Sequence, residues 1–211
     1  MIKLTDKRIA EMQHNFVADE DTWRDVFKRP FTDAEYTYAS DTTIILRIAK
    51  KYFKNAPEIS LKLPQLDGVI PEHNPTMTIT REQIRKTLVL HSIDAYCLGV
   101  DCPECNGRGS VSWSYTDRNG ATYNMMDDCP VCDGGCEVRN GKGTWCRMFG
   151  RYINVHNLIL MHYVMNEWEI DEASVSCNDK CYIFNLADGI DIIAVTLQNK
   201  PQDVGIIEFK E

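Results

Sequence analysis

The sequence predicts an α+β protein, rich in antiparallel sheet, into which a zinc-binding β-hairpin module is inserted. Short segments in which apolar and polar residues alternate occur on both sides of the chain centre, and this alternation is typical of half-buried strands. Segments with helical spacing of apolar residues lie between them. Two Cys-Pro-x-Cys pairs stand in the middle of the chain. We therefore expect residues 1–99 and 148–211 to form two parts of one α+β domain, with the module at 100–147.

The first part of the chain begins with helical periodicity and then changes to strand periodicity. Ile9, Met12 and Phe16 share one face of a helix, whereas Ile44, Leu46 and Ile48 alternate with other residues. Four residues of the stretch 64–76 are proline or glycine, which predicts a loop. The elements expected, in order, are helices at 5–17 and 21–29, a hairpin at 36–48 that turns near Asp41, a strand at 59–63 and a loop at 64–76.

Later segments predict further helices and a run of strands. Thr80 and Gln83 form a capping box, which opens a helix whose buried side includes Ile84 and Leu88. Four large apolar residues beyond the module recur at three- and four-residue intervals, so we expect a helix that faces the core. These four are Leu158, Met161, Met165 and Trp168. The expected elements are helices at 80–93 and 157–168 and strands at 151–155, 173–177, 181–187, 190–197 and 203–209.

The cysteine module is the most specific motif in the chain. Cys102 and Cys105 form one Cys-Pro-x-Cys turn and Cys129 and Cys132 form another, and each turn lets two thiolates reach one ion at about 2.3 Å. Alternating residues around an Asn-Gly turn predict a hairpin of strands 111–116 and 121–126, which brings the two pairs together. Glycines after each pair allow the left-handed turns that such a site needs, at Gly107, Gly109, Gly134 and Gly135. We expect Cys102, Cys105, Cys129 and Cys132 to hold one structural zinc ion with no open coordination position.

Other readings of the nine cysteines stay open at this point. Iron in a rubredoxin-like site would use the same four ligands and imply electron transfer. The cysteines could also form two disulfides or remain free thiols, and Cys136 or Cys146 could replace one ligand. For Cys177 and Cys181, near a predicted hairpin tip, free thiols are favoured over a disulfide.

Composition narrows the class of protein. The 211 residues carry a net charge of −8, which argues against general coating of nucleic acid but allows a local basic stripe. Charges interrupt the N-terminal segment where a signal peptide would need an apolar core, and no stretch reaches the roughly 18 apolar residues that span a bilayer. We expect a cytoplasmic protein with no membrane segment, in which clustered cysteines bind metal.

The text CPECNGRG, and less closely CPVCDGGC, resembles the Cys-x-x-Cys-x-Gly-x-Gly repeat of the DnaJ-type zinc-finger domain. The resemblance covers about 45 residues. This sequence has two repeats where the chaperone has four, which implies one zinc ion instead of two. Cys136 also departs from the second repeat, so a chaperone function is not carried over.

A second resemblance concerns the flanking segments. The segment 34–50, AEYTYASDTTIILRIAK, resembles a strand pair of bacterial sliding clamps of the DNA polymerase III β-subunit type, with Thr42 where that family has glycine. Residues 151–170 and 174–199 resemble the strand, helix and antiparallel strands of a clamp subdomain. The resemblance implies a clamp-like domain into which the zinc module is inserted, although the chain is much shorter than a clamp protomer.

Catalytic motifs are poor in this sequence. None of the five histidines has a motif such as His-Glu-x-x-His, so we predict no catalytic residue, no enzyme activity and no small-molecule substrate. Trp113 and Tyr115 lie on the predicted hairpin, and Arg139, Lys142 and Arg147 lie near Trp145 and Phe149 just beyond it. These residues could contact nucleic acid or a protein partner, but we favour packing of the hairpin aromatics on the main domain.

Three functional hypotheses follow. We favour a non-catalytic, zinc-containing binding protein, clamp-like in fold, that contacts DNA or a partner of the DNA-replication type. The alternative is a protein–protein adaptor whose DnaJ-like zinc hairpin binds a peptide, and a second alternative is an enzyme with an unrecognised active site. The first predicts a clustered basic face, the second an apolar groove beside the hairpin, and the third a deep pocket with convergent ionisable groups.

Overall fold

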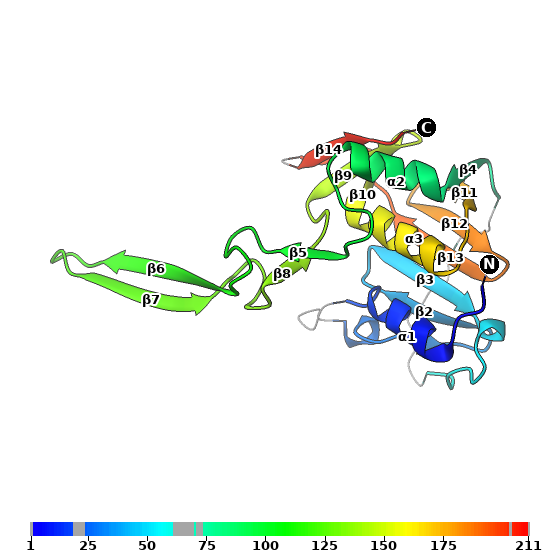
Figure 1. Ribbon diagram of the computed structural model, residues 1–211, viewed down its shortest axis with the longest axis horizontal. Helices are drawn as coiled ribbons and strands as arrows, with labels where there is room; N and C mark the ends of the chain where they lie inside the picture. The colour runs from blue at the N-terminus through cyan, green and yellow to red at the C-terminus, as the bar shows by residue number, and fades with distance from the viewer. Residues whose placement is uncertain (1, 19–23, 61–69, 71–73, 203, 211) are drawn as a thin grey trace.

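A computed structural model describes residues 2–18, 24–60, 70, 74–202 and 204–210, and its main feature is a seven-stranded sheet (Figure 1). The strands lie in the order β1-β2-β3-β13-β12-β11-β4, and every neighbouring pair is antiparallel. They are β1 (Phe31–Thr32), β2 (Tyr36–Ser40), β3 (Ile44–Ala49), β4 (Met77–Thr80), β11 (Glu172–Cys177), β12 (Cys181–Ala187) and β13 (Ile190–Val195). The predicted α+β, mainly antiparallel fold class is confirmed.

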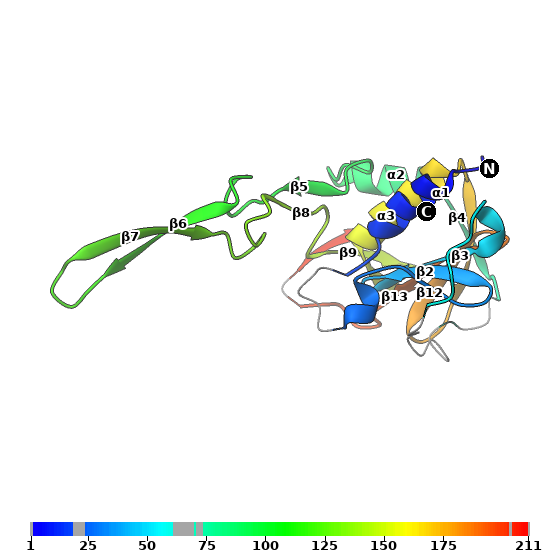
Figure 2. The same cartoon turned by 90° about the horizontal axis from the view of Figure 1, so that it is seen from below.

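Three helices cover one face of this sheet (Figure 2). They are α1 (Asp6–His14), α2 (Arg81–Leu90) and α3 (Val155–Glu167), and two 3₁₀ turns occur at Asp25–Phe27 and Lys50–Tyr52. Helix α2 begins with the predicted capping box, since the Thr80 hydroxyl accepts from the Gln83 amide and the Gln83 side chain accepts from the Thr80 amide. Helix α3 is buried on almost every side and lies at the centre of the domain.

Two apolar layers hold the sheet in place. The larger lies between sheet and helices and includes Leu88 and Trp168, with Phe184 from the sheet. The smaller covers the opposite face and includes Phe31 and Ile183. Phe184 and Ile183 enter different layers because successive side chains of a strand point to opposite faces. Each fully buried side chain of this size contributes about 1.5–3 kcal/mol to the free energy of folding.

A small second sheet joins the module to the domain. It contains β10 (Arg151–Asn154), β9 (Thr144–Met148) and β14 (Gly205–Glu208), in that order. Strands β9 and β10 are antiparallel, whereas β14 runs parallel to β9. The strands expected near 151–155 and 203–209 are therefore present. Strand β9 was not predicted, and its residues Cys146 and Met148 are buried in the larger core.

Several expectations for the first half of the chain need correction. The helix expected at 21–29 is a 3₁₀ turn over Asp25–Phe27, with 19–23 outside the described residues. The strand expected at 59–63 does not occur at residues 59–60, where the Ser60 amide instead donates to the Thr32 carbonyl, and 61–63 lie outside the described residues. Strand β4 was not predicted. It forms because Met77–Thr80 pairs with β11, far away in sequence.

The remaining strands build an arm that projects from the domain (Figure 1). They are β5 (Gly99–Asp101), β6 (Ser110–Thr116), β7 (Thr122–Asp128) and β8 (Glu137–Arg139). Strand β5 pairs with β8 at the foot of the arm, and β6 pairs with β7 to form the outer ribbon. None of the described helices combines the length and apolar character that crossing a membrane requires.

Candidate metal centre and the arm that it closes

Two cysteine turns of similar construction lie between the foot of the arm and its outer ribbon. In the first turn, the Gly107 amide donates to the Cys102 carbonyl, and the Gly109 amide donates to Cys105 Sγ at 3.2 Å. Asn106, Gly107 and Gly109 all have positive φ angles. This backbone wraps around the Cys105 thiol and directs an amide at its sulfur, which is the environment of a metal-bound thiolate.

The second turn repeats this construction with one substitution. The Gly134 amide donates to the Cys129 carbonyl, and Asp133, Gly134 and Cys136 have positive φ angles. Cys136 thus occupies the position that Gly109 has in the first turn, and adopts the left-handed conformation without being glycine. Gly135, which was expected to share this conformation, is not in the left-handed region.

Backbone hydrogen bonds join the two turns reciprocally. The Cys102 amide donates to the Cys136 carbonyl, and the Cys129 amide donates to the Gly109 carbonyl, both at 2.8 Å. The last residue of each turn therefore binds the first residue of the other. This exchange places the four thiols around one point between the turns.

The thiol geometry fits a tetrahedral metal ion. Cys102 Sγ lies 3.7 Å from Cys129 Sγ, and Cys105 Sγ lies 3.7 Å from Cys132 Sγ. All four sulfur atoms lie within 4.8 Å of one another. A tetrahedron with metal–sulfur bonds of about 2.3 Å has sulfur–sulfur edges of about 3.8 Å, whereas a disulfide bond is about 2.05 Å long. The four predicted cysteines are thus brought together, with two of their sulfur pairs at the separation that a shared ion requires.

Burial and the neighbouring groups shift the ionisation of these thiols. Burial favours the neutral Cys105 thiol, but the Gly109 amide and the other three thiols outweigh it, so the pKa of Cys105 falls to about 7. Burial, followed by hydrogen bonds with the thiols of Cys105, Cys129 and Cys102, raises the pKa of Cys132 to about 12. One thiolate therefore forms readily and is stabilised by the donors around it.

The other cysteines lie outside this cluster. Cys146 is buried in the larger core of the domain, where burial raises its pKa to about 12. Cys177 and Cys181 are free thiols, as expected, and Cys136 is also free. Cys136 Sγ lies 3.7 Å from the Gly134 carbonyl oxygen.

The outer ribbon has two different faces. Trp113 pairs with Met125 and Tyr115 pairs with Tyr123, so these four side chains project from the same face. They are 53%, 61%, 66% and 59% exposed, respectively. The opposite face carries mainly serine, threonine and asparagine, at Ser110, Ser112, Ser114, Thr116, Thr122 and Asn124, together with Met126 and Asp128. The expectation that the hairpin aromatics pack on the main domain was therefore wrong.

The foot of the arm is attached to the domain by polar contacts. Arg139 Nη1 lies 2.5 Å from Asp41 Oδ2, and Arg139 Nη2 donates to the Val17 carbonyl at 3.2 Å. The Asn140 side chain donates to the carbonyls of Asp94 and Cys97. These contacts reach three separate segments of the domain, so they fix the direction in which the arm leaves it.

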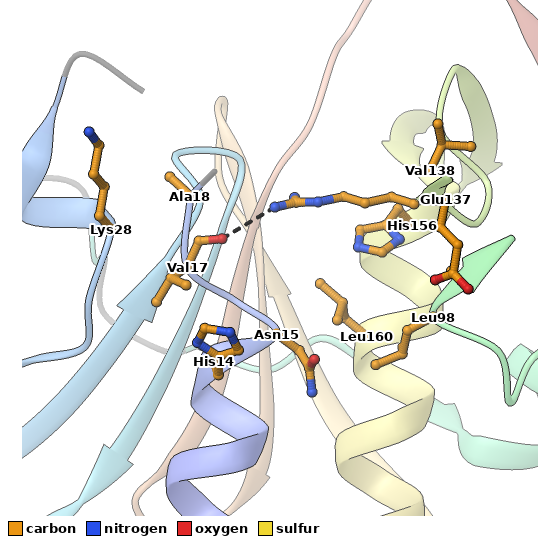
Figure 3. Close-up of a pocket in the computed structure, with 12 residues that line it drawn as sticks. His14, Asn15, Val17, Ala18, Lys28, Leu98, Glu137, Val138, His156 and Leu160 are labelled. Atoms are coloured by element: carbon orange, nitrogen blue, oxygen red, sulfur yellow. Dashed lines mark hydrogen bonds between the residues drawn. The ribbon is translucent and has the colours of Figure 1, made fainter. Parts of the chain in front are cut away.

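A cleft of about 570 Å³ lies at this junction (Figure 3). His14 and Val17 line it from the end of α1, while Glu137 and His156 line it from the arm and α3. His156 Nδ1 lies 3.0 Å from the Asn140 carbonyl oxygen. The hydrogen bonds of His156 and Arg139 that border the cleft thus tie the arm to the domain.

The basic and aromatic residues beyond the module are spread over different environments. Arg147 forms a long ion pair with Glu208 at 4.0 Å, and Phe149 packs against the larger core and the ring of Phe209. Trp145 lies within β9 and is half-buried. Arg147 and Phe149 thus have partners within the domain.

No family model and no curated protein matches the sequence. Among solved structures, the chain is similar to the DNA polymerase sliding clamp of Pseudomonas aeruginosa, with a TM-score of 0.49 and 9% identity, over 93% of this chain and 66% of that one. It is also similar to the β subunit of a DNA polymerase from Streptococcus pyogenes, with a TM-score of 0.45 and 7% identity, over 95% and 65% of the two chains. The β chain of DNA polymerase III from Streptococcus pneumoniae gives a TM-score of 0.46 and 8% identity, over 93% and 64%.

The chain therefore spans less than two thirds of the length of each of these three proteins. Residues 34–50, 151–170 and 174–199 carry the sequence resemblance to sliding clamps, and one of these three structures is of a sliding clamp. The DnaJ-type resemblance has no matching family model and rests on the cysteine turns themselves.

Proposed function

We propose that this protein is a non-catalytic binding protein, in which one structural zinc ion supports a β-ribbon arm whose aromatic face contacts a protein partner. Cys102, Cys105, Cys129 and Cys132 would hold the ion. When bound, the ion supplies structural cross-linking, since four protein sulfurs leave no position for a substrate or water. Iron offers the same geometry, and metal analysis of the purified protein distinguishes the two.

The observation that carries the proposal is the exposed aromatic face of the ribbon. Trp113, Tyr115, Tyr123 and Met125 form two neighbouring cross-strand pairs on one face of a structure that projects into solvent. Soluble proteins rarely expose contiguous apolar surface of this kind unless it contacts a partner. Tryptophan, tyrosine and methionine are enriched in protein–protein interfaces, whereas serine is depleted, which matches the difference between the two faces.

The charge of the arm favours a protein over DNA as the partner. Between residues 108 and 128 the arm carries two arginines, Arg108 and Arg118, and three aspartates, Asp117, Asp127 and Asp128. DNA-binding ribbons need cations to neutralise phosphates, and this arm has a net negative charge. Contact with a replication-type partner stays a prediction. Contact with DNA also stays a prediction, and the domain would have to supply the basic residues for it.

Site-specific photo-crosslinking tests the proposal. A photoreactive amino acid replaces Trp113 or Tyr123 on the aromatic face, and Ser112 or Thr122 on the polar face as matched controls. Each zinc-loaded variant is irradiated in extract of the cells that make the protein naturally. We expect a discrete protein adduct from the first two positions and none from the controls.

Equal labelling of both faces, or no protein adduct from either, would contradict the proposal. Fluorescence anisotropy with duplex DNA is the parallel measurement. Binding that weakens steeply as salt rises, and that survives removal of the aromatic side chains, would instead support the DNA hypothesis.

A further inference from the structure

The outer ribbon lacks the support that such a structure ordinarily needs. All seven residues of β7 and the last five of β6 are exposed, so neither face of most of the ribbon packs on anything within the described part of the chain. An isolated two-stranded hairpin is marginally stable in water, and stability ordinarily requires a third strand or a packed face. The metal centre holds only the inner end of the ribbon, near Cys129 and Gly109. The aromatic face is therefore the surface that needs a cover.

We infer that this cover is the same ribbon of a second copy of the chain, packed face to face so that the tip of each arm lies against the foot of the other. This inference rests on the proposed function, because it names the partner of the same aromatic face. Two ribbons packed in this way form a small sandwich of two sheets about 10 Å apart.

Self-complementarity of the aromatic rows supports this arrangement. A two-fold axis between the Trp113–Met125 row and the Tyr115–Tyr123 row places each row against the other row of the second copy. Every contact is then made twice, and aromatic rings meet aromatic rings or a methionine thioether, both of which pack favourably. Serines and threonines remain on the outer, solvated faces.

Charge selects the tip-to-foot orientation. Asp127 pairs with Val111 at the foot of the ribbon, so its side chain projects from the aromatic face, whereas Arg118 lies in the turn at the tip. Tip-to-foot packing places Arg118 of one copy near Asp127 of the other, twice. Packing with the two tips together would instead place Arg118 near Arg118 and Asp127 near Asp127. Asp117, in the same turn as Arg118, has its carboxylate bound by the amides of Asn119 and Ala121. Within one chain, Arg118 and Asp127 are about 20 Å apart, beyond the range of screened charge interactions.

The contact area is sufficient for a reversible dimer. Four large side chains that are half to two-thirds exposed offer on the order of 500 Å² on each ribbon. A symmetric pair would bury about 1,000 Å² in total, at the lower limit for a specific protein–protein interface. A dimer that dissociates on dilution is therefore expected, in contrast to a permanent assembly.

Sedimentation of the zinc-loaded full chain from about 1 to 100 μM tests the inference, with duplicate runs in high salt. The monomer mass is 24.2 kDa, and we expect the mass to approach twice that value as the concentration rises. Trp113→Ser should raise the dissociation constant at least about 30-fold, because interface tryptophans of this kind dominate binding. Met126→Ser, on the opposite face, is the matched control and should leave it unchanged.

Exchanging the charges of Arg118 and Asp127 gives a second test, which unlike Trp113→Ser removes no large apolar side chain. At about 0.1 M salt, where the Debye length is about 10 Å, Arg118→Asp alone and Asp127→Arg alone should each weaken the dimer roughly tenfold. The double variant, with both changes in one chain, should restore it. Since the two residues are too distant to interact within one chain, restoration requires contact between copies. Metal content measured for every variant shows that the arm is intact.

A wild-type protein that stays monomeric up to 100 μM would overturn the inference, as would a dimer that is insensitive to Trp113 and to the charge exchange. Photo-crosslinking separates this failure from failure of the proposed function. A monomer whose Trp113 position labels a different protein contradicts only the second-copy assignment. A monomer without any adduct contradicts both.

Discussion

Arg139 and Asp41 form an ion pair between the foot of the arm and the turn that joins β2 to β3, 98 residues earlier in the chain. The Asp41 side chain is only 8% exposed and also accepts hydrogen bonds from the amides of Thr43 and Ile44. One carboxylate thus closes a turn of the domain and fixes the arm to it.

Removing the charge of Arg139 should loosen the arm. Arg139→Met keeps the apolar stem, while Asp41 retains its two amide donors, so we expect the free energy of unfolding to fall by only about 1 kcal/mol. The distance distribution between spin labels on the ribbon and on α2 should broaden. Arg147→Met is the control, because its partner Glu208 is 4.0 Å away and both side chains are exposed. An unchanged distribution in Arg139→Met would show that other contacts orient the arm.

Loss of one thiol from the cluster should release the metal ion and unfold the arm but not the domain. In Cys102→Ser, three sulfurs remain, and structural zinc binding is coupled to local folding. Cys102, Cys105 and Cys129 form an apolar cluster separate from both layers of the domain, so the domain should keep its cooperative unfolding transition. Elemental analysis and hydrogen exchange measure the two effects.

The matched variant is Cys136→Gly. It introduces glycine at a left-handed position, as at Gly109 in the first turn, and should keep one metal ion per chain. Loss of the ion in that variant would show that Cys136 is a ligand. A wild-type protein that contains neither zinc nor iron would contradict the metal assignment altogether.

Thr42 offers a position at which a single change should stabilise the protein. Its φ angle is 81°, a conformation that is strained for a β-branched residue, and its side chain is exposed. Thr42→Gly should raise the free energy of unfolding by about 1 kcal/mol in denaturant titration. Thr43→Gly should do the opposite, since the Thr43 hydroxyl donates to Asp41 Oδ1 at 2.8 Å. Destabilisation by both changes would refute the strain argument.

Alanine substitutions at two glycines beyond β8 should distinguish the stability cost of backbone strain from that of a steric clash. Gly141 and Gly143 have φ angles of 74° and 78°. A Cβ atom at Gly141 would lie 2.7 Å from Val155 Cγ1, whereas none of the described atoms lies within 4 Å of such an atom at Gly143. Gly143→Ala should cost about 1 kcal/mol, for strain alone, and Gly141→Ala at least about 1 kcal/mol more. Thermal unfolding of both variants measures the difference, and equal losses would contradict the close packing at α3.

His162 should make stability depend on pH. The ring is 1% exposed, and burial is the main reason why its pKa is lowered. The charges of Arg81 and Arg85 add to this effect, while the Ala95 carbonyl and Glu82 oppose it. Because the folded-state pKa lies below the unfolded value of about 6.5, the unfolded chain binds the proton first.

His162 therefore stabilises the fold fully above pH 6.5, and this contribution falls as the pH drops toward the folded-state pKa. His162→Gln should flatten the dependence of the unfolding free energy on pH between about 6.5 and 5. His91→Gln, at an exposed position, should retain the wild-type slope. An unchanged slope in His162→Gln would show that other groups bind the proton.

Local chemistry made much of the fold predictable. The Thr80–Gln83 capping box, the turn at Asp41 and the Asn119-Gly120 hairpin each depend on residues a few positions apart. Strand β4 escaped prediction because its partner β11 is distant in sequence. The four residues Met77–Thr80 do not by themselves show a pattern that separates them from the proline-rich loop before them. Strand β9 was missed although it pairs with β10 across the short turn at Phe149 and Gly150, both of which have positive φ angles; its other partner, β14, is distant.

The four clustered cysteines and the antiparallel α+β architecture follow from the sequence by itself, because the spacing of paired thiols and the alternation of side chains act over short distances. Only the tertiary structure decides where the aromatic side chains of the ribbon point. Alternation assigns Trp113 and Tyr115 to one face but does not say whether that face meets the domain or solvent. Long-range contacts such as Arg139–Asp41 settle the direction of the arm, and they leave the aromatic face exposed.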